Sequence, residues 1–451
     1  MNTLPNDNKL VSDENYSSKS DVLVFLEEKL ENVCNFRDRY FETHSLDDAI
    51  HKNDDLKKLQ EETLKIFEEN ETAATKSNKA KYFFMKGALL NVVPEYSKDA
   101  ENLLSKAIKL DRKLVEAWNE LGDCYWKNDE VKKSKSCFEG ALKERKNKVS
   151  LRNLSMLSRQ EVVISQAECI ANVEKGLNYA KEAVKLDAQD GLSWSCLGNA
   201  HLSYFFHVQQ NPKILKQAIS AYFQAEKDIV ARSSPDLHYN KGIMLKYKEE
   251  FKEALESFKK SSLYDPTWDR PKKREQQLIE YLNNIEELVS TKGKMKTKKL
   301  KNLLDSIDSK HLGPYLEDTK NILTGANARL IRVNIQELKP GVNELKVLLG
   351  KVVCSVRNED TVPFTFCLVD ETGECVVVTL FNLADGKGVI IGDSVAIPEP
   401  LVTDVNFDYN SVSYKFRLIR VETPILVAVN GKLLQKDQTA GVQMSIFRKF
   451  D

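Results

Sequence analysis

The sequence has little glycine and proline, and it has no excess of charge of either sign. Only 18 glycines and 12 prolines occur among 451 residues, which disfavours a loop-rich all-β chain and favours long helices. Lys and Arg together number 67, as do Asp and Glu, so the formal net charge is zero. A neutral chain lacks the overall basic field with which proteins wrap duplex nucleic acid.

Signals for disulfides, metal sites and membrane segments are also missing. The eight cysteines include no Cys-x-x-Cys pair and have no histidine at ligand spacing, so we interpret them as reduced, mostly buried thiols and expect no metal and no cofactor. No segment approaches the ~18 apolar residues of a membrane span, and residues 1–19 lack the apolar core of a signal peptide. These absences predict a protein of the cytoplasm and nucleus without a membrane partner.

Helical periodicity governs the first part of the chain. After a flexible tail at 1–19, apolar residues recur at three- and four-residue steps from Asp21, which predicts an amphipathic helix. A second helix is expected over 46–69, so residues 20–75 form an N-terminal helical segment.

A repeat of about 34 residues marks the middle of the chain. In the clearest unit, large and small residues follow the tetratricopeptide (TPR) pattern: Trp118, Leu121, Gly122, Tyr125, Ser134, Phe138 and Ala141. The small residues allow two helices to touch closely, and the large ones fill the spaces between them. Five such units and a capping helix at 268–288 predict an all-α solenoid over 76–290. A helical bundle with chance spacing is the alternative.

The pattern changes after residue 290. A Lys-rich linker is expected over 291–325, and β-branched runs of period two then predict strands at 345–354, 364–369, 374–381, 390–396 and 413–421. Five strands in about a hundred residues indicate a small all-β barrel of the OB type over 326–435, followed by a flexible tail at 436–451. A β-sandwich remains an alternative. The predicted fold class is multidomain, α plus β.

Catalytic patterns are not evident. The histidines are scattered, and His201 stands where a TPR unit packs an aromatic ring, so we interpret it as a core residue. The glycines at 386, 388 and 392 lack the strand-glycine-helix context of a phosphate loop. Without paired carboxylates or a nucleophile elbow, we expect no enzyme.

The concave face of a TPR solenoid is its usual binding surface. Counting first-helix positions assigns to this face a group of polar and aromatic residues that we predict to bind peptide: Arg152, Arg159, Asn199, Asp236 and Tyr239. Arginines in one repeat and an aspartate two repeats later suit a peptide with one basic and one acidic side chain close together. Charges that only solvate an exposed face are the alternative.

Lysines crowd residues 292–301 in an otherwise neutral chain. A solvated linker, a contact with a phosphate backbone and a nuclear-import signal are all consistent with this run. The barrel itself has few basic residues beside Phe364 and Phe366, so we favour a protein-binding or ribosome-facing role for it over stacking of single strands.

Four sequence blocks, at 36–45, 115–119, 147–156 and 392–400, resemble the tetratricopeptide repeat protein 5 (Strap) family. The resemblance runs from about residue 22 to 434 and implies a non-enzymatic adaptor with six TPR units and an OB domain. The family binds nascent tubulin N-terminal peptides, which begin Met-Arg-Glu, at the ribosome exit site. It then recruits an adaptor of a deadenylase complex, so that tubulin mRNA decays (tubulin autoregulation). The alternative role is a stress-responsive nuclear transcription cofactor that scaffolds a histone acetyltransferase coactivator.

The resemblance also implies roles for individual residues. Arg159 would meet the glutamate of the peptide and Asp236 its arginine. Asp269 follows the Asp-Pro-x-Trp block at 265–268, one residue away from the family's acidic position. Lys106 and Lys109 match the lysines that would recruit the deadenylase adaptor. Lys296 and Lys298 match the positions that would touch ribosomal RNA.

Overall fold

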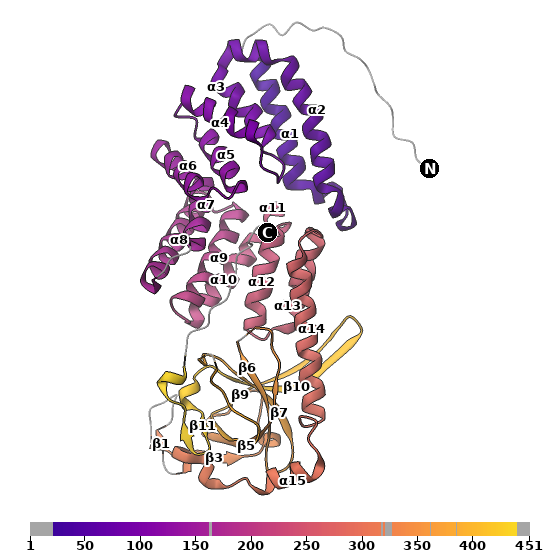
Figure 1. The fold of residues 1–451 in the computed structure, drawn as a ribbon, viewed down its shortest axis with the longest axis vertical. Helices are drawn as coiled ribbons and strands as arrows, with labels where there is room; N and C mark the ends of the chain where they lie inside the picture. The colour runs from indigo at the N-terminus through magenta and orange to yellow at the C-terminus, as the bar shows by residue number, and fades with distance from the viewer. Residues whose placement is uncertain are drawn as a thin grey trace, which may run out of the picture. The chain divides into compact units, whose positions relative to one another are not determined.

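The computed structural model describes residues 21–439 except 162–164, 317–318, 321–326, 361 and 385. The predicted tail at 1–19 and most of the tail at 436–451 lie outside the described residues. Helices form the first part of the chain and strands the last part (Figure 1). The helices are α1 (Asp21–Thr43), α2 (Lys52–Glu69), α3 (Glu71–Leu90), α4 (Lys98–Leu110), α5 (Val115–Lys127), α6 (Val131–Glu144), α7 (Lys148–Gln160), α8 (Gln166–Leu186), α9 (Gly191–His207), α10 (Pro212–Ala225), α11 (Ile229–Arg232), α12 (Pro235–Tyr247), α13 (Phe251–Tyr264), α14 (Asp269–Ser290) and α15 (Thr297–Asp305).

Helix pairs occupy all five predicted repeats, as α3/α4, α5/α6, α7/α8, α9/α10 and α12/α13. The small residues of the pattern lie where the paired helices touch. A Cβ atom at Gly122 would lie 2.7 Å from the Phe138 ring, and one at Gly242 would lie 2.7 Å from the Phe258 ring. Because real Cβ contacts are never so short, glycine is required at both positions, as the repeat pattern predicted.

Two compact units divide the chain. The first comprises residues up to Tyr204 together with Lys216–Leu237 and Leu263–Thr267. The second comprises Phe205–Leu215, His238–Ser262 and the chain from Trp268 onward. Most of the last repeat therefore belongs to the same compact unit as the β-domain, so the boundary predicted at residue 290 falls inside a unit. The boundary predicted at residue 75 falls inside α3.

The main β-sheet has ten strands, of which four match predicted ones closely. They are β3 (Ile331–Val333), β4 (Gly341–Val342), β5 (Lys346–Val356), β6 (Phe364–Val369), β7 (Cys375–Leu380), β8 (Ser394–Pro398), β9 (Leu401–Tyr409), β10 (Val412–Val421), β11 (Ala428–Val429) and β12 (Lys432–Leu433), and β1 (Thr319–Lys320) pairs separately with β2 (Asn327–Ala328). The prediction at 390–396 was wrong in its first half, because Ile390 and Ile391 lie in an exposed turn before β8.

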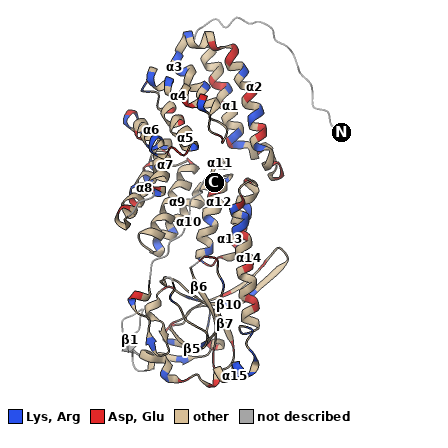
Figure 2. Cartoon of the chain, in the orientation of Figure 1, with Lys and Arg blue, Asp and Glu red and all other residues tan. Residues whose placement is uncertain are grey.

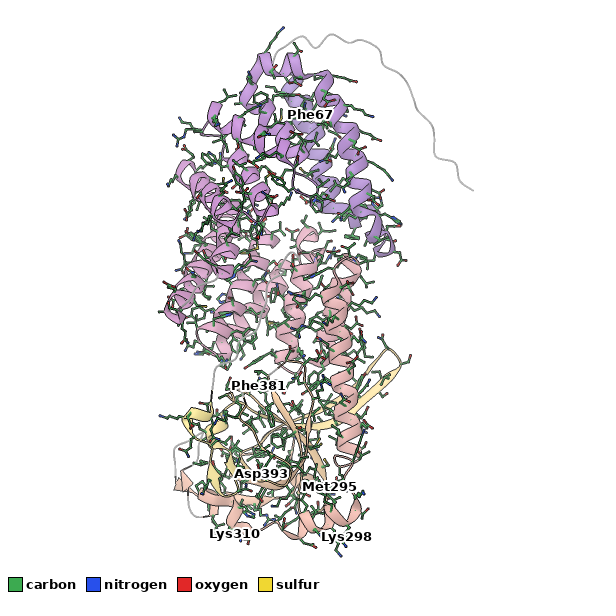
Figure 3. All side chains as sticks on the ribbon, viewed as in Figure 1. Phe67, Met295, Lys298, Lys310, Phe381 and Asp393 are labelled. Carbon is green, nitrogen blue, oxygen red and sulfur yellow. The ribbon has the colours of Figure 1, made fainter. Side chains whose placement is uncertain are left out.

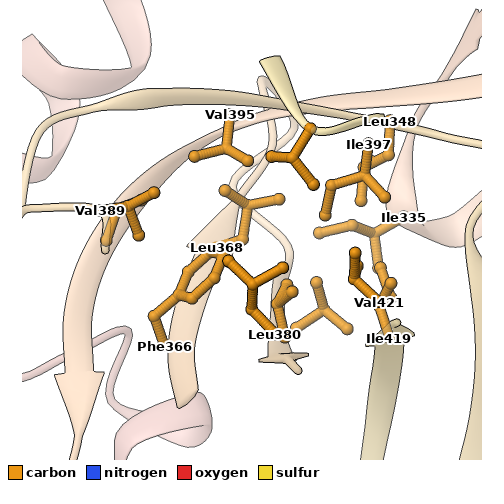
Figure 4. Close-up of a cluster of buried hydrophobic side chains, with 14 of the residues drawn as sticks. Ile335, Leu348, Phe366, Leu368, Leu380, Val389, Val395, Ile397, Ile419 and Val421 are labelled. Carbon is orange, nitrogen blue, oxygen red and sulfur yellow. The ribbon is translucent and has the colours of Figure 1, made fainter. Parts of the chain in front are cut away.

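The barrel is closed by β8 and β9, which follow each other in the chain and pair with different ends of the sheet. Strands β5, β6 and β7 form an antiparallel meander, and β7 runs parallel to β10. β8 pairs with β5, whereas β9, which follows after Glu399 and Pro400, pairs with β10. The two strands thus join both ends of the sheet, as the OB prediction requires. Buried aliphatic and aromatic side chains such as Leu348, Phe366 and Ile419 fill the interior (Figure 4).

The capping helix α14 was predicted correctly, and it packs on the barrel within the second compact unit. The Tyr281 hydroxyl lies 2.8 Å from Thr365 Oγ1. Asp360, in the β5–β6 loop, accepts hydrogen bonds from Arg274 of α14 at 2.5 Å and from Lys246 of α12 at 2.6 Å. One carboxylate therefore ties the last repeat, the capping helix and the barrel together.

The segment predicted as a linker at 291–325 has regular structure in its described part. It contains α15 and the 3-10 segment Ser309–Leu316. Leu312 and Tyr315 of this segment are buried against Leu349 of the barrel, and the Tyr315 hydroxyl donates to the Leu426 carbonyl at 2.5 Å. This part of the chain is a layer of the β-domain and not an extended connector.

Candidate functional site

Arg159 lies in the last turn of α7 and is buried, with 7% of its surface exposed. The helix begins where the Asn147 side chain accepts a hydrogen bond from the Ser150 backbone at 2.8 Å, an N-cap that the sequence favours. One turn before Arg159, Ser155 accepts a hydrogen bond from its guanidinium and donates to the Gly176 carbonyl at 2.6 Å. The head group is therefore held in a defined position between α7 and α8.

The surroundings of Arg159 disfavour its charge. Burial lowers the pKa of the guanidinium, and the Cys196 thiol and Tyr222 hydroxyl act in the opposite direction. We call Arg159, Ser155, Cys196, Asn199 and Tyr222 the Arg159 cluster. A ligand carboxylate in this buried environment of low dielectric constant would interact with the guanidinium more strongly than it would in water.

Tyr222 is a member of this cluster that our sequence reasoning did not assign to the site. Its hydroxyl donates to Asn199 Oδ1 at 2.7 Å. This bond orients the amide, so the Asn199 nitrogen is left to donate elsewhere. The repeat pattern could have indicated Tyr222. Phe138 and Phe258 occupy the same position in other units, so the hydroxyl of Tyr222 is an addition that packing alone does not require.

The two predicted acidic residues lie at helix starts. Asp236 is half-buried in the first turn of α12, and Asp269 is the exposed first residue of α14. Carboxylates in a first turn are favoured by the helix dipole. Asp236 belongs to the same compact unit as the Arg159 cluster, whereas Asp269 belongs to the other unit.

Two further predicted contacts are engaged within the protein. Arg152 forms an ion pair with Asp190, which Lys148 also approaches at 3.2 Å. Although burial alone would raise it, Arg152 and Ser193 hold the pKa of Asp190 below its ordinary value. Tyr239 is 1% exposed, because Trp268 packs on its ring at 4.8 Å. Arg152 therefore brings an already paired charge, and Tyr239 is part of a packed core.

A second polar cluster links α1 to α5 of the repeats, and no sequence pattern indicated it. Arg37 donates to both oxygens of Asp38, at 2.7 and 3.1 Å. Although burial alone would lower it, Asp38 raises the pKa of Arg37. Burial and the neighbouring Asp123 raise the pKa of Glu120, which also acts on Arg37 and accepts from Asn91 at 2.9 Å.

The lysines implied in partner recruitment lie on exposed surface. Lys106 and Lys109 are both exposed on α4, and the Lys106 ammonium lies 5.9 Å from the centre of the Phe83 ring. Lys296 and Lys298 are exposed at the start of α15, with further lysines beside them (Figures 2 and 3). Lys294 of the same run pairs with Glu287 at 2.7 Å, so the run is not wholly without partners in the chain.

Among the described residues, no group of three His, Cys, Asp or Glu side chains is arranged to hold a metal ion. None of the described helices is both long and apolar enough to cross a membrane.

Comparison with known proteins gives a consistent picture. The family model of the tetratricopeptide repeat protein 5 OB fold domain matches residues 329–443, and a tetratricopeptide repeat model matches 115–148. Tetratricopeptide repeat protein 5 of Homo sapiens is 46% identical over 424 residues, 94% of this chain and 96% of its own length. The Bos taurus protein is 47% identical over 413 residues, 91% and 93% of the two chains. Among solved structures, YrrB, a TPR protein with an unusual peptide-binding site, is 23% identical, covers 46% of this chain and 97% of its own, and has a TM-score of 0.31.

Proposed function

The chain belongs to the tetratricopeptide repeat protein 5 family, and from that premise we propose that it is a non-enzymatic adaptor for nascent tubulin chains. In this proposal its TPR solenoid binds the N-terminal Met-Arg-Glu of tubulin at the ribosome exit site. The bound protein then recruits a deadenylase complex through a further adaptor, and tubulin mRNA decays.

The Arg159 cluster is the observation that supports the proposal best. A guanidinium whose pKa is lowered by burial gains most from a ligand that brings a negative charge. The glutamate of Met-Arg-Glu is such a ligand, and its carboxylate can accept two hydrogen bonds from the guanidinium. The oriented Asn199 amide adds a donor suited to a backbone carbonyl of the peptide.

The other residues predicted to bind peptide differ in the part they play in this proposal. Asp236 is assigned to the peptide's arginine, because it is a half-buried carboxylate in the same compact unit as Arg159. Asp269 is exposed and belongs to the other compact unit, so it is given no part in this site. Arg152 supports the site indirectly, through its pair with Asp190. Tyr239 packs on Trp268 in the other compact unit and is given no part in this site.

Recruitment and ribosome binding are assigned to other surfaces. Lys106 and Lys109 lie exposed on a second helix of a repeat, where the deadenylase adaptor would meet a positive surface. Lys296 and Lys298 would contact ribosomal RNA. We place this activity in the cytoplasm, with the nuclear cofactor role as the alternative function.

Titration of a Met-Arg-Glu peptide against the full chain tests the proposal. Arg159→Glu should weaken binding by about 2–5 kcal/mol, because it removes a charge-assisted pair and adds repulsion. Lys106→Glu with Lys109→Glu is the matched control, and it should leave peptide affinity unchanged while stopping decay of tubulin mRNA in cells.

Changes in the peptide keep this test independent of the stability of the variant. Replacing the peptide's glutamate with glutamine should weaken binding to the wild-type chain, whereas it should strengthen binding to Arg159→Glu, because the repulsion between the two carboxylates is removed. Equal affinity of wild type for both peptides would contradict the assignment. Capture of an acetyltransferase coactivator without any selectivity for tubulin chains on ribosomes would favour the nuclear role.

A further inference from the structure

Strand β9 has a long edge that no described strand covers. On one side it pairs with β10 along nearly its whole length, from Leu401 to Tyr409. On the other side only Leu401 and Val402 pair, with the short strand β4. From Thr403 onward, this edge of β9 has no partner strand among the described residues.

The register shows which backbone groups face the open edge. The Pro400 carbonyl accepts a hydrogen bond from Asn343 on the β4 side, at 3.1 Å. Because successive residues of a strand direct their N–H and C=O groups to opposite sides, Asp404, Asn406 and Asp408 direct theirs to the same side as Pro400. These residues present a row of donors and acceptors that a further strand can pair with.

A cavity of about 420 Å³ lies along this edge. One wall is residues 249–253, where α13 begins, and the other is the six consecutive residues 403–408. Since alternate side chains of a strand point to opposite faces, a cavity that touches six in a row adjoins the edge of the strand and not one face. All of these residues belong to the second compact unit.

The lining is acidic. It contains five carboxylates, of Glu249, Glu250, Glu253, Asp404 and Asp408, and one basic side chain, that of Lys252. Glu249 is paired with Arg420 inside the protein. Glu250 and Asp404 form ion pairs with Lys248 and Arg417, and the side chains in these pairs are between 29% and 48% exposed. Pairs so close to solvent contribute little to stability.

Two of these carboxylates have no ion pair within the described part of the chain. They are Glu253, in the first turn of α13, and Asp408, which accepts only from the hydroxyl of Ser413.

We propose that the β9 edge is a second binding site, which takes an extended, Lys- or Arg-rich segment of a partner protein as an added strand. The backbone of the partner pairs with Asp404, Asn406 and Asp408, and its basic side chains meet the carboxylates of the cavity. A second copy of this chain does not fit, because two β9 edges side by side would bring their aspartates together.

Titration of capped peptides against the full chain tests this proposal. The probe is Lys-Val-Lys-Val-Lys, with Glu-Val-Glu-Val-Glu as the charge control and the valine-N-methylated Lys peptide as the backbone control. We expect only the first to bind and to slow hydrogen exchange at the β9 amides. Binding of the acidic peptide or the N-methylated peptide with equal affinity would overturn the proposal, as would the absence of any binding.

Variants separate the backbone contribution from the charge contribution. Asn406→Pro removes one outward N–H without removing a β10 hydrogen bond and should abolish binding, with its melting temperature as the check on folding. Glu253→Lys with Asp408→Lys should weaken binding by about tenfold. The control Glu62→Lys, at an exposed residue of α2, should leave peptide affinity unchanged. Unchanged affinity in both edge variants would show that the peptide binds elsewhere.

Discussion

His201 illustrates how one buried titratable residue affects stability. It lies in α9, is 6% exposed, and its Nδ1 atom has no hydrogen-bond partner among the described residues. Burial lowers the pKa of His201 to about 4 from an ordinary value of 6.5, and Lys181 adds to the effect. The folded chain therefore keeps this histidine neutral at a pH where the unfolded chain protonates it.

We expect the free energy of unfolding to decrease as the pH falls from 6.5 toward 4, by up to ~3 kcal/mol from this residue. His201→Phe places at this position an aromatic ring, as Tyr125 supplies in the α5/α6 repeat, and should remove this part of the pH dependence. Denaturant unfolding of both proteins at several pH values measures it, with the exposed His51→Ala as the control. Parallel pH profiles for wild type and His201→Phe would contradict the assignment.

Repeat spacing predicted which residues face the partner helix but not what covers them from outside the repeat. His201 was correctly predicted as a core residue, because its position within a unit decides its burial. Tyr239 was placed on the binding face by the same counting, yet Trp268 and the start of α14 cover it. The pairing of Arg152 with Asp190 likewise joins residues 38 positions apart, which no local pattern reveals.

At the scale of elements, the longest strand that sequence reasoning missed, β9, is the one that bears the proposed second site. In β9, the buried Val402 and Val405 are separated by two consecutive exposed residues, Thr403 and Asp404, so the first part of the strand does not alternate between buried and exposed residues. Aspartate and asparagine favour turns, so the segment gave no strand signal. Its pairing with β10 over nine residues stabilises the strand against that local preference.

Helix α15 turns the lysine run into a positive surface of defined shape. Lys298, Lys299 and Lys301 are exposed on the helix, and Lys296 precedes it. If this surface contacts ribosomal RNA, each phosphate it neutralises steepens the salt dependence of log affinity by roughly 0.7–0.9. Lys296→Glu with Lys298→Glu should therefore weaken ribosome binding and flatten the salt slope by one to two such steps, measured by co-sedimentation at several salt concentrations.

The matched control reverses two exposed lysines of α2 and α3, Lys65 and Lys76, so that net charge changes equally. If the control loses the same amount of ribosome affinity, the loss in the Lys296 and Lys298 variant is due to the change in net charge and not to a contact at α15. A change in nuclear distribution with ribosome binding intact would favour the import-signal interpretation of the lysine run.

At the scale of the whole molecule, the last repeat and the barrel share a buried ionic centre. Glu249, in the turn between α12 and α13, lies 3.2 Å from Arg420 of β10 and accepts a hydrogen bond from Thr379 at 2.6 Å. Arg420 stacks on Phe381 at 3.9 Å and donates to the Tyr247 carbonyl at 2.8 Å. Burial raises the pKa of Glu249 even though Arg420 opposes the shift. These contacts explain why the repeat pattern ends in the same compact unit as the barrel.

Removing the cation from this centre should destabilise the second compact unit as a whole. Arg420→Met leaves a buried carboxylate without its partner, which typically costs about 3–5 kcal/mol. Adding Glu249→Gln should recover part of this loss, because an amide tolerates burial better than an unpaired charge. Lys57→Met, which breaks the exposed pair with Glu95, should cost no more than about 1 kcal/mol. Calorimetry of the four proteins measures these costs, and hydrogen exchange should show faster opening of both α13 and β10 in Arg420→Met. Faster opening of β10 with α13 unaffected would show that the last repeat and the barrel unfold separately.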